Sequence, residues 1–310
     1  EGNVVIIIND ADVVVVDASG APRSAQTVIA EIRRLTKKPV RYLINTHGHG
    51  DHTIGNQEYL KEFPGIEIIA HEKTAEYISG GGYNYVDEIA QSPESRKKNG
   101  EAEIARLKAE NKPENDKIIE NLAQYYRRDI DIRQAEYKKV KRTPPTITIE
   151  KSLRLYRGKR IIDILHFGAG DTPGDLVVYL PQERLVCTGD MITEPVPFGF
   201  SRFPLEWLQT LEQVSRLEFD TLIPGHGELQ TGKAYLQKVM GLLQSSQEQV
   251  KRAIDAGADL EAVKNQVDLT GFENEFGGGN PVYRYYFREY FSIPNVERTF
   301  NELKTKKEQK

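Results

Sequence analysis

Short runs of β-branched residues, followed by an amphipathic helical pattern, constrain the fold of this chain more than any other feature. Residues 4–8 and 13–16 consist only of Val and Ile, which is typical of buried strands. Residues 24–37 then place apolar side chains at helical spacing, with Ser24 as the expected N-cap. Further strand patterns follow at 40–44 and 66–70. Because strands and helices alternate, the sequence predicts a layered α/β fold.

The rest of the chain divides by composition. Residues 73–145 are highly charged and predict a helical insertion, with residues 101–139 as one polar helix whose alternating charges face solvent. Strands are predicted next at 146–149, 153–155, 161–165, 176–180 and 185–187, and helices with one short strand at 205–217, 221–223, 233–256 and 260–267. An aromatic C-terminal tail, 281–310, is expected to pack on the core, with a homodimer contact as the alternative. We therefore predict a single domain over residues 1–310.

Composition excludes several classes of protein. Cys187 is the single cysteine, so a disulfide framework and a four-cysteine zinc site are excluded. A formal charge of −4 disfavours a nucleic-acid partner, and no apolar stretch reaches the roughly 18–20 residues of a membrane helix. The chain opens on a strand without Met or leader, which suggests a trimmed or processed N-terminus. We expect a soluble protein, and the sequence leaves the cytoplasm and the bacterial periplasm open as its compartment.

The segment Thr46-His47-Gly48-His49-Gly50-Asp51-His52 carries the strongest chemical signal. It holds three of the six histidines and a carboxylate, directly after an apolar strand. Crowding of imidazoles in so small a volume is explained by metal binding. Neutral imidazole suits Zn, Mn or Fe, and an Asp adds a hard anionic ligand.

In these residues the sequence resembles the metallo-β-lactamase superfamily, whose further motifs follow in the family's order. They are Asp17 after the second strand, Gly170-Asp171-Thr172-Pro173-Gly174-Asp175, Thr188-Gly189-Asp190 and Pro224-Gly225-His226-Gly227. The resemblance implies a four-layer αββα sandwich of the metallo-β-lactamase type. It also implies that His47 and His49 hold one metal, that Asp51, His52 and His226 hold a second, and that Asp190 bridges the two.

Asp171 departs from the family pattern, which usually has His at this position. With Asp51, Asp171 and Asp190 ionised and one bridging hydroxide, two divalent metals would be formally neutralised. The centre should then attract anions weakly. Because Asp is shorter than His, we expect a dinuclear zinc centre whose first site is weakened, with Mn or Fe as alternative metals.

The remaining polar residues near the motifs receive supporting roles. Asp17 and Asp175 are expected to orient ligating imidazoles through their second ring nitrogen. His71 and His166 lie near strand ends without a motif position, and we expect ordinary structural roles for both. Cys187 lies in an apolar strand and is expected to be a small buried side chain.

The predicted activity is metal-dependent hydrolysis. A metal-bound hydroxide, oriented by Asp51 as the catalytic ligand, would attack an ester, lactone or amide carbonyl of a small-molecule substrate. The loop 191–204 is rich in Pro and Phe, and either forms an apolar pocket wall or packs against the insertion; the former predicts a substrate with an apolar portion. Two alternatives remain open, a β-lactamase-like amide hydrolase of low activity and a catalytically degenerate metal-binding module.

Overall fold

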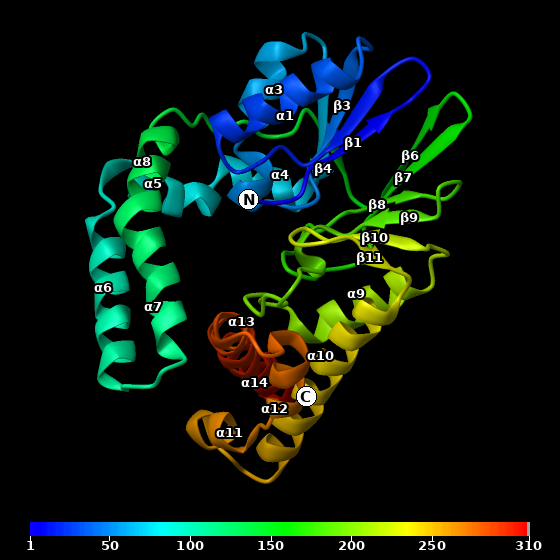
Figure 1. The fold of residues 1–310 in the computed structure, drawn as a ribbon. Coiled ribbons are helices and arrows are strands. Elements are labelled where there is room, and N and C mark those ends of the chain that lie inside the picture. The colour runs from blue at the N-terminus through cyan, green and yellow to red at the C-terminus, as the bar shows by residue number, and fades with distance from the viewer. Residues whose placement is uncertain (309–310) are drawn as a thin grey trace. The chain divides into compact units, whose positions relative to one another are not determined.

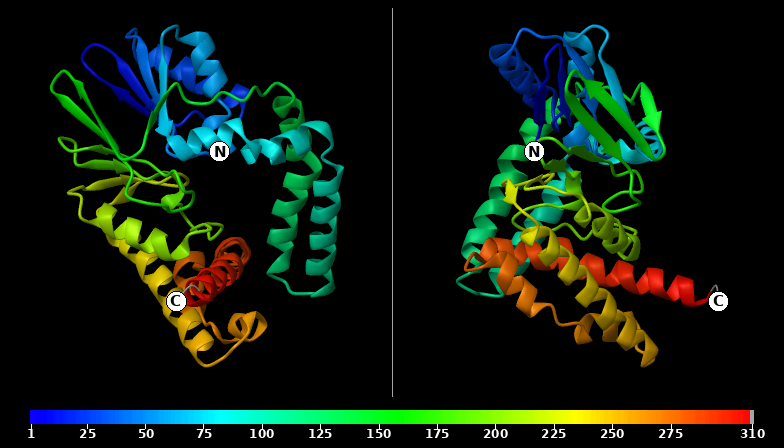
Figure 2. Two further views of the ribbon diagram at one scale, coloured as in Figure 1. Left: turned by 180° about the vertical axis from the view of Figure 1, so that it is seen from behind. Right: turned by 90° about the vertical axis from the view of Figure 1, so that its right-hand side faces the viewer.

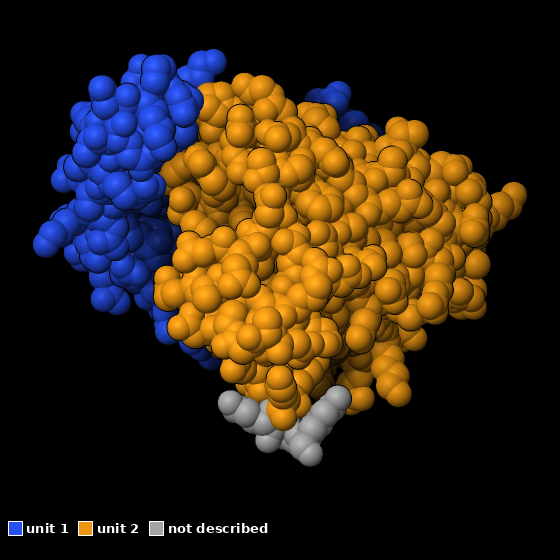
Figure 3. Space-filling model, turned by 90° about the horizontal axis from the view of Figure 1, so that it is seen from below, with its two compact units in different colours: residues 1–8, 12–69, 75–147 blue, residues 9–11, 70–74, 148–310 orange. Residues whose placement is uncertain are grey.

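The computed structural model describes residues 1–308, and the chain divides into two compact units (Figure 3). Unit 1 comprises residues 1–8, 12–69 and 75–147, and unit 2 comprises residues 9–11, 70–74 and 148–310. Each unit is built on its own sheet. None of the helices within residues 1–308 combines the length and apolar character needed to cross a bilayer.

Unit 1 is built on a five-stranded sheet in the order β1-β2-β3-β4-β5. Figure 1 labels β1, β3 and β4 of this sheet. β1 and β2 are antiparallel, whereas β2, β3 and β4 run parallel. All four valines of β2 are buried, as expected for a strand covered on both faces. The strands are β1 (Val5–Ile8), β2 (Val13–Val16), β3 (Val40–Ile44), β4 (Glu67–His71) and β5 (Ile147–Ile149).

Two helices cover this sheet, α1 (Pro22–Leu35) and α3 (Asn56–Glu62). Ile29 and Ile32 of α1 pack in one core with Tyr59 of α3 and the strand residues. The prediction of Ser24 as N-cap is wrong, because α1 begins at Pro22 with Ala21 as its N-cap. Proline favours the first helical position, since its fixed φ suits the helix and its missing N–H would have no partner there.

The helical insertion has a small hydrophobic core, in which residues such as Val86 and Ile130 pack together with Ile54 from outside the insertion. A single helix over 101–139 is wrong, because the chain turns at Asn111, which has a φ of +51°, and at Pro113. The helices before and after this turn, α6 and α7 with η2, lie side by side (Figure 2). Gly100 lets them approach closely, since a Cβ there would lie 2.2 Å from the Tyr126 ring. The elements are α4 (Glu72–Ser79), η1 (Gly81–Tyr83), α5 (Asn84–Gln91), α6 (Glu94–Ala109), α7 (Asn115–Gln124), η2 (Tyr125–Asp129) and α8 (Ile130–Tyr137).

Unit 2 is built on a six-stranded sheet in the order β11-β10-β9-β8-β7-β6. All neighbours are antiparallel except β9 and β10, which are parallel. The strands are β6 (Ser152–Arg157), β7 (Arg160–Leu165), β8 (Val177–Leu180), β9 (Leu185–Cys187), β10 (Thr221–Ile223) and β11 (Gln230–Thr231). The parallel pair matters for function, because the carboxyl ends of parallel strands lie at the same sheet edge.

Helices from the second half of the chain complete the core of unit 2. Trp207 is fully buried there and donates a hydrogen bond from Nε1 to the Met191 carbonyl at 3.2 Å. Phe287 and Phe291 belong to this core, as predicted for the aromatic tail. The elements are α9 (Pro204–Ser215), α10 (Ala234–Asp255), α11 (Leu260–Gln266), α12 (Thr270–Gly277), α13 (Pro281–Tyr286), η4 (Phe287–Ser292) and α14 (Ile293–Glu308). The domain boundaries stay predictions, and residues 309–310 of the tail lie outside the described part.

Candidate metal centre

The histidine-rich segment leaves the carboxyl end of β3. His47 and His49 lie in the loop, while Asp51 and His52 lie in the short helix α2 (Gly50–Thr53). His47 and His52 are fully buried. The ring centroid of His47 lies 4.8 Å from that of His49 and 4.4 Å from that of His52. The tight turn therefore gathers three imidazoles in a small volume, as the sequence predicts.

Asp17 orients this segment from the neighbouring strand. Val16 of β2 is in register with Ile44 of β3, so the residues that follow the two strands lie together. The Asp17 carboxylate accepts hydrogen bonds of 2.8 Å from the backbone N–H and from the hydroxyl of Thr46, and it lies 2.8 Å from His52 Nδ1. The predicted supporting role of Asp17 is confirmed, since it leaves His52 Nε2 on the side of Asp51 Oδ2, at 3.7 Å.

Tyrosines of the insertion pack against the two glycines of the segment, a feature that the sequence analysis missed. A Cβ at Gly48 would lie 2.7 Å from the Tyr77 ring, and one at Gly50 would lie 2.0 Å from the Tyr85 hydroxyl. Burial raises the pKa of Tyr85 well above its usual value, so its hydroxyl stays protonated. The alternation of His and Gly in the segment was the available signal for this close approach.

Asp190 and His226 lie at the carboxyl ends of β9 and β10. Cys187 is in register with Ile223, and the Gly225 N–H donates to the Gly189 carbonyl at 2.8 Å. Asp190, in the 3₁₀ turn η3 (Gly189–Met191), has Oδ1 3.4 Å from His226 Nε2. A Cβ at residue 225 would lie 2.0 Å from this same oxygen, so only glycine fits there.

Asp171 lies in the loop that follows β7. It is 7 % exposed, and Asp175 secures the turn by accepting hydrogen bonds from Thr172, at 3.0 Å from its backbone N–H and 2.6 Å from its hydroxyl. These bonds give the Asp175 carboxylate a role in shaping the turn, and its predicted role in orienting a ligating imidazole stays a prediction. Asp171 is thus presented by a loop that its own sequence motif stabilises.

His71, His166 and Cys187 have structural roles, in agreement with the sequence analysis. The His71 and His166 rings lie 4.1 Å apart between centroids. His166 Nδ1 bonds the Asp175 carbonyl at 2.9 Å, and His71 Nε2 bonds the Glu150 carbonyl at 3.1 Å. Cys187 is buried in β9.

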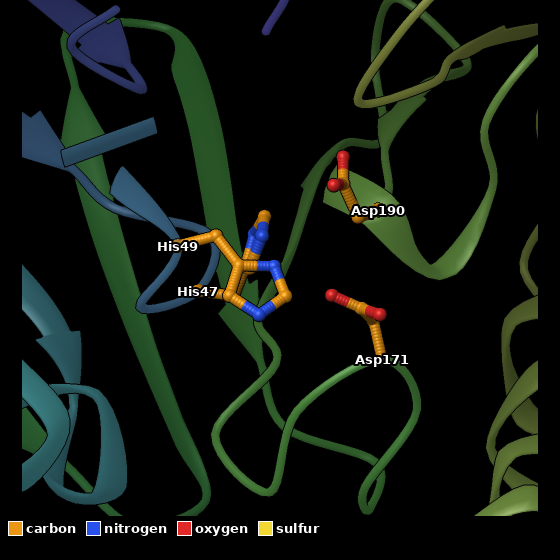
Figure 4. A group of neighbouring side chains, drawn as sticks. All are labelled: His47, His49, Asp171 and Asp190. Carbon is orange, nitrogen blue, oxygen red and sulfur yellow. The ribbon is translucent and has the colours of Figure 1, made fainter. Parts of the chain in front are cut away.

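Two groups of side chains meet the distances that a metal ion requires. The first is His47, His49, Asp171 and Asp190 (Figure 4), and the second is Asp51, His52, Asp190 and His226; within each group the ligand atoms lie within 4.8 Å of one another. Imidazole with carboxylate is a donor set that suits Zn, Mn or Fe. The residues therefore fit two metal ions that share Asp190, and ligation by each stays a prediction.

Comparison with known proteins gives the family. The sequence model of the metallo-beta-lactamase superfamily matches residues 1–226. The linear primary-alkylsulfatase of Pseudomonas sp. (strain ATCC 19151) is 21% identical over 293 residues, which are 90% of this chain and 51% of that protein. The chain thus spans about half the length of this relative.

Solved structures share the fold at low identity. The inverting sec-alkylsulfatase Pisa1 from Pseudomonas sp. matches with a TM-score of 0.65 and 17% identity, over 97% of this chain and 47% of its own. A metallo-beta-lactamase from Pontibacter korlensis matches with a TM-score of 0.51 and 16% identity, over 77% of this chain and 85% of its own. The resemblance inferred from the motifs is confirmed: this chain belongs to the metallo-beta-lactamase superfamily, with its αββα fold.

Proposed function

We propose that this protein hydrolyses sulfate monoesters of alkyl chains, consuming one water and releasing an alcohol and hydrogen sulfate. The observation that carries the proposal is the extent of its similarity to alkylsulfatases, which covers 90% of the chain in sequence and 97% in structure. Metallo-beta-lactamase structures cover 77% to 79% of the chain. The likeness to alkylsulfatases therefore includes parts of the fold that the lactamases leave uncovered.

The ligand groups would supply the hydrolytic machinery. His47, His49, Asp171 and Asp190 would hold one ion, and Asp51, His52, Asp190 and His226 the other. Such ions, when bound, lower the pKa of water towards about 7 and polarise the group under attack. The Asp51 side chain is one-third exposed, so its carboxylate can accept a hydrogen bond from the attacking water and orient it.

A row of aromatic rings beside His226 supports an alkyl substrate. Phe198 lies 5.6 Å from the His226 ring and 6.4 Å from Tyr290, measured between centroids. Tyr290 in turn contacts Phe200 at 5.9 Å and Tyr286 at 5.1 Å. We propose that this aromatic row (Phe198, Phe200, Tyr286 and Tyr290) binds the alkyl chain, since burial of a methylene contributes about 0.8 kcal/mol.

Attack on a carbonyl of a neutral ester, lactone or amide is the second candidate. It is favoured by Asp171, because three carboxylates and a hydroxide would balance the charge of two divalent ions. A centre of that kind would draw a neutral substrate as well as an anionic one. A sulfate monoester, which is anionic, needs positive charge from elsewhere in the protein.

A panel of substrates with matched chain length distinguishes the two candidates. The metal-loaded protein would be offered dodecyl sulfate, a p-nitrophenyl ester of dodecanoic acid, an acyl-homoserine lactone and nitrocefin, each with Zn, Mn or Fe. We expect release of inorganic sulfate from the first and little turnover of the others. Turnover of a carbonyl substrate without sulfate release would favour the second candidate, and inactivity with every metal would favour a binding module.

Asp190→Asn tests whether the ligand groups are needed for this activity, because Asp190 belongs to both of them. Asp163→Asn is the matched control. It removes another buried carboxylate of unit 2, one that pairs with Arg154 at 2.6 Å rather than with a ligand. We expect loss of sulfate release in the first variant and its retention in the second.

A further inference from the structure

A basic cavity of unit 2 lies outside the ligand groups. It has a volume of about 440 Å³ and is formed between the end of the loop 191–203 and helix α14. Its lining side chains are Arg202, Arg298, Asn301, Glu302, Thr305 and Lys306. Three of these are cationic and one is anionic, so the cavity carries an excess of positive charge.

The charge of Lys306 is balanced within the cavity, whereas the charges of the two arginines are not. Lys306 Nζ lies 2.8 Å from Glu302 Oε1, and the other oxygen of Glu302 accepts a hydrogen bond from the Leu205 N–H at 3.1 Å. Among the described residues, no carboxylate lies within ion-pair distance of Arg202 or Arg298. Two guanidinium groups therefore line one cavity without a carboxylate in direct contact with either.

The positive charges of Arg202 and Arg298 act on each other. Burial and the charge of Arg202 lower the pKa of Arg298, and the carboxylates of Asp171 and Glu297 oppose this effect. Placing like charges together costs free energy unless an anion lies between them. The cavity also lies near a candidate metal ligand, because Ser201, next to Arg202, donates a hydrogen bond to the carbonyl of Gly170, next to Asp171.

The loop that carries Arg202 is anchored at several points. The Ser201 hydroxyl donates to the Gly170 carbonyl, next to Asp171, and the Phe203 N–H donates to Ser201 Oγ at 3.0 Å. The Gly199 N–H donates to the Tyr290 carbonyl at 2.7 Å. Arg202 is thus held in place, and it lies two residues after Phe200 of the aromatic row.

We propose that Arg202 and Arg298 form a subsite for a tetrahedral oxyanion, the sulfate group of an alkyl sulfate or the inorganic sulfate released from it. The inference rests on the proposed function for its biological ligand. Guanidinium binds such an anion through paired N–H donors in a fixed planar fork. A metal centre whose charge is neutralised by three carboxylates would not supply this attraction for an anion. One loop would then present aromatic rings to the alkyl chain and a guanidinium to the anion.

The test measures binding of inorganic sulfate to the metal-loaded protein by calorimetry, independently of turnover. Arg298→Ala and Arg202→Ala should each weaken sulfate binding by about tenfold or more, because each removes charge-assisted hydrogen bonds. Arg298→Lys should lie between Arg298→Ala and the wild type. Arg252→Ala removes an exposed positive charge of α10 and should leave the Kd unchanged.

The kinetic arm separates this inference from the proposed function. If dodecyl sulfate is hydrolysed, both alanine variants should raise KM more than they lower kcat, as expected for loss of substrate binding. Wild-type sulfate binding that is undetectable, or equal in the wild type and both alanine variants, would overturn the subsite even if alkyl sulfates are hydrolysed. Arginine-dependent binding of inorganic sulfate without any sulfatase activity would support the subsite and contradict the proposed function.

Discussion

Asp17→Asn should weaken metal binding at the second ligand group while leaving the fold intact. Asp17 is buried and lies 2.8 Å from His52 Nδ1. A carboxylate accepts the Nδ1 proton, which leaves the Nε2 lone pair available for a metal. An amide nitrogen at the same place donates to Nδ1, so the proton moves to Nε2 and blocks ligation by His52.

The size of the effect follows from the bonds that change. Loss of such an orienting partner lowers metal affinity by about 10–100-fold, equivalent to about 1.4–2.7 kcal/mol. The side-chain carbonyl of the introduced asparagine can still accept the bond from the Thr46 N–H, so we expect the metal-free protein to lose only about 1–3 kcal/mol of stability. Asparagine also tolerates the φ of +63° at this residue, which alanine would not.

The assay is competition with a chelator, read as metal content by mass spectrometry, with urea unfolding of the metal-free protein alongside. Asp163→Asn serves again as the control, because it removes a buried carboxylate that pairs with Arg154. We expect the Asp17 variant to retain the first ion and lose the second at a lower chelator concentration. If the Asp17→Asn protein is folded and retains both ions as tightly as the wild type does, the claim that Asp17 sets the tautomer of His52 is refuted.

Three further predictions concern other positions. Asp171→Ala should lower the bound metal from two ions to one per chain by mass spectrometry, and an unchanged count would remove Asp171 from the ligands. Gly225→Ala should abolish metal binding at Asp190, since the new Cβ would lie 2.0 Å from Asp190 Oδ1. The control Gly241→Ala in α10 places its Cβ in open space, so it should raise the free energy of unfolding measured in urea by roughly 0.5–1 kcal/mol. Burial and His166 lower the pKa of His71, so its contribution to stability is complete above the unfolded-state pKa of about 6.5 and is lost as the pH falls through the lower folded-state pKa. Urea midpoints measured from pH 8 to 5 should therefore fall less in His71→Gln than in the wild type, and equal slopes would contradict this assignment.

The histidine-rich segment after β3 could be predicted from its own residues, because three imidazoles and a carboxylate crowd directly after an apolar strand. Asp17, Asp171, Asp190 and His226 were assigned through the resemblance to the superfamily. The structure adds a physical reason for most of these positions: the residues that follow β2 and β3, and those that follow β9 and β10, lie at carboxyl ends of parallel strands, where the sheet fixes them.

Features that depend on packing between distant segments were not predictable. The single helix expected over 101–139 failed because a charged sequence does not show where a hairpin turns, although Asn111 and Pro113 mark the turn. The contact of Tyr77 and Tyr85 with Gly48 and Gly50 requires the fold of the insertion.

The basic cavity was beyond sequence analysis for a similar reason. Arg202 and Arg298 are 96 positions apart and belong to no common motif. Each resembles an ordinary surface arginine until the loop and α14 are placed together. Charge composition alone therefore gives no indication of the anion subsite.

The central claim is that the two ligand groups hold metal ions that drive sulfate ester hydrolysis. The most direct test is to titrate metal into the metal-free protein while measuring inorganic sulfate released from dodecyl sulfate. We predict no release without metal, a rise that reaches its plateau at about two equivalents, and no response in Asp190→Asn. Sulfate release that is independent of metal, or a fully metal-loaded protein that releases none, would contradict the account.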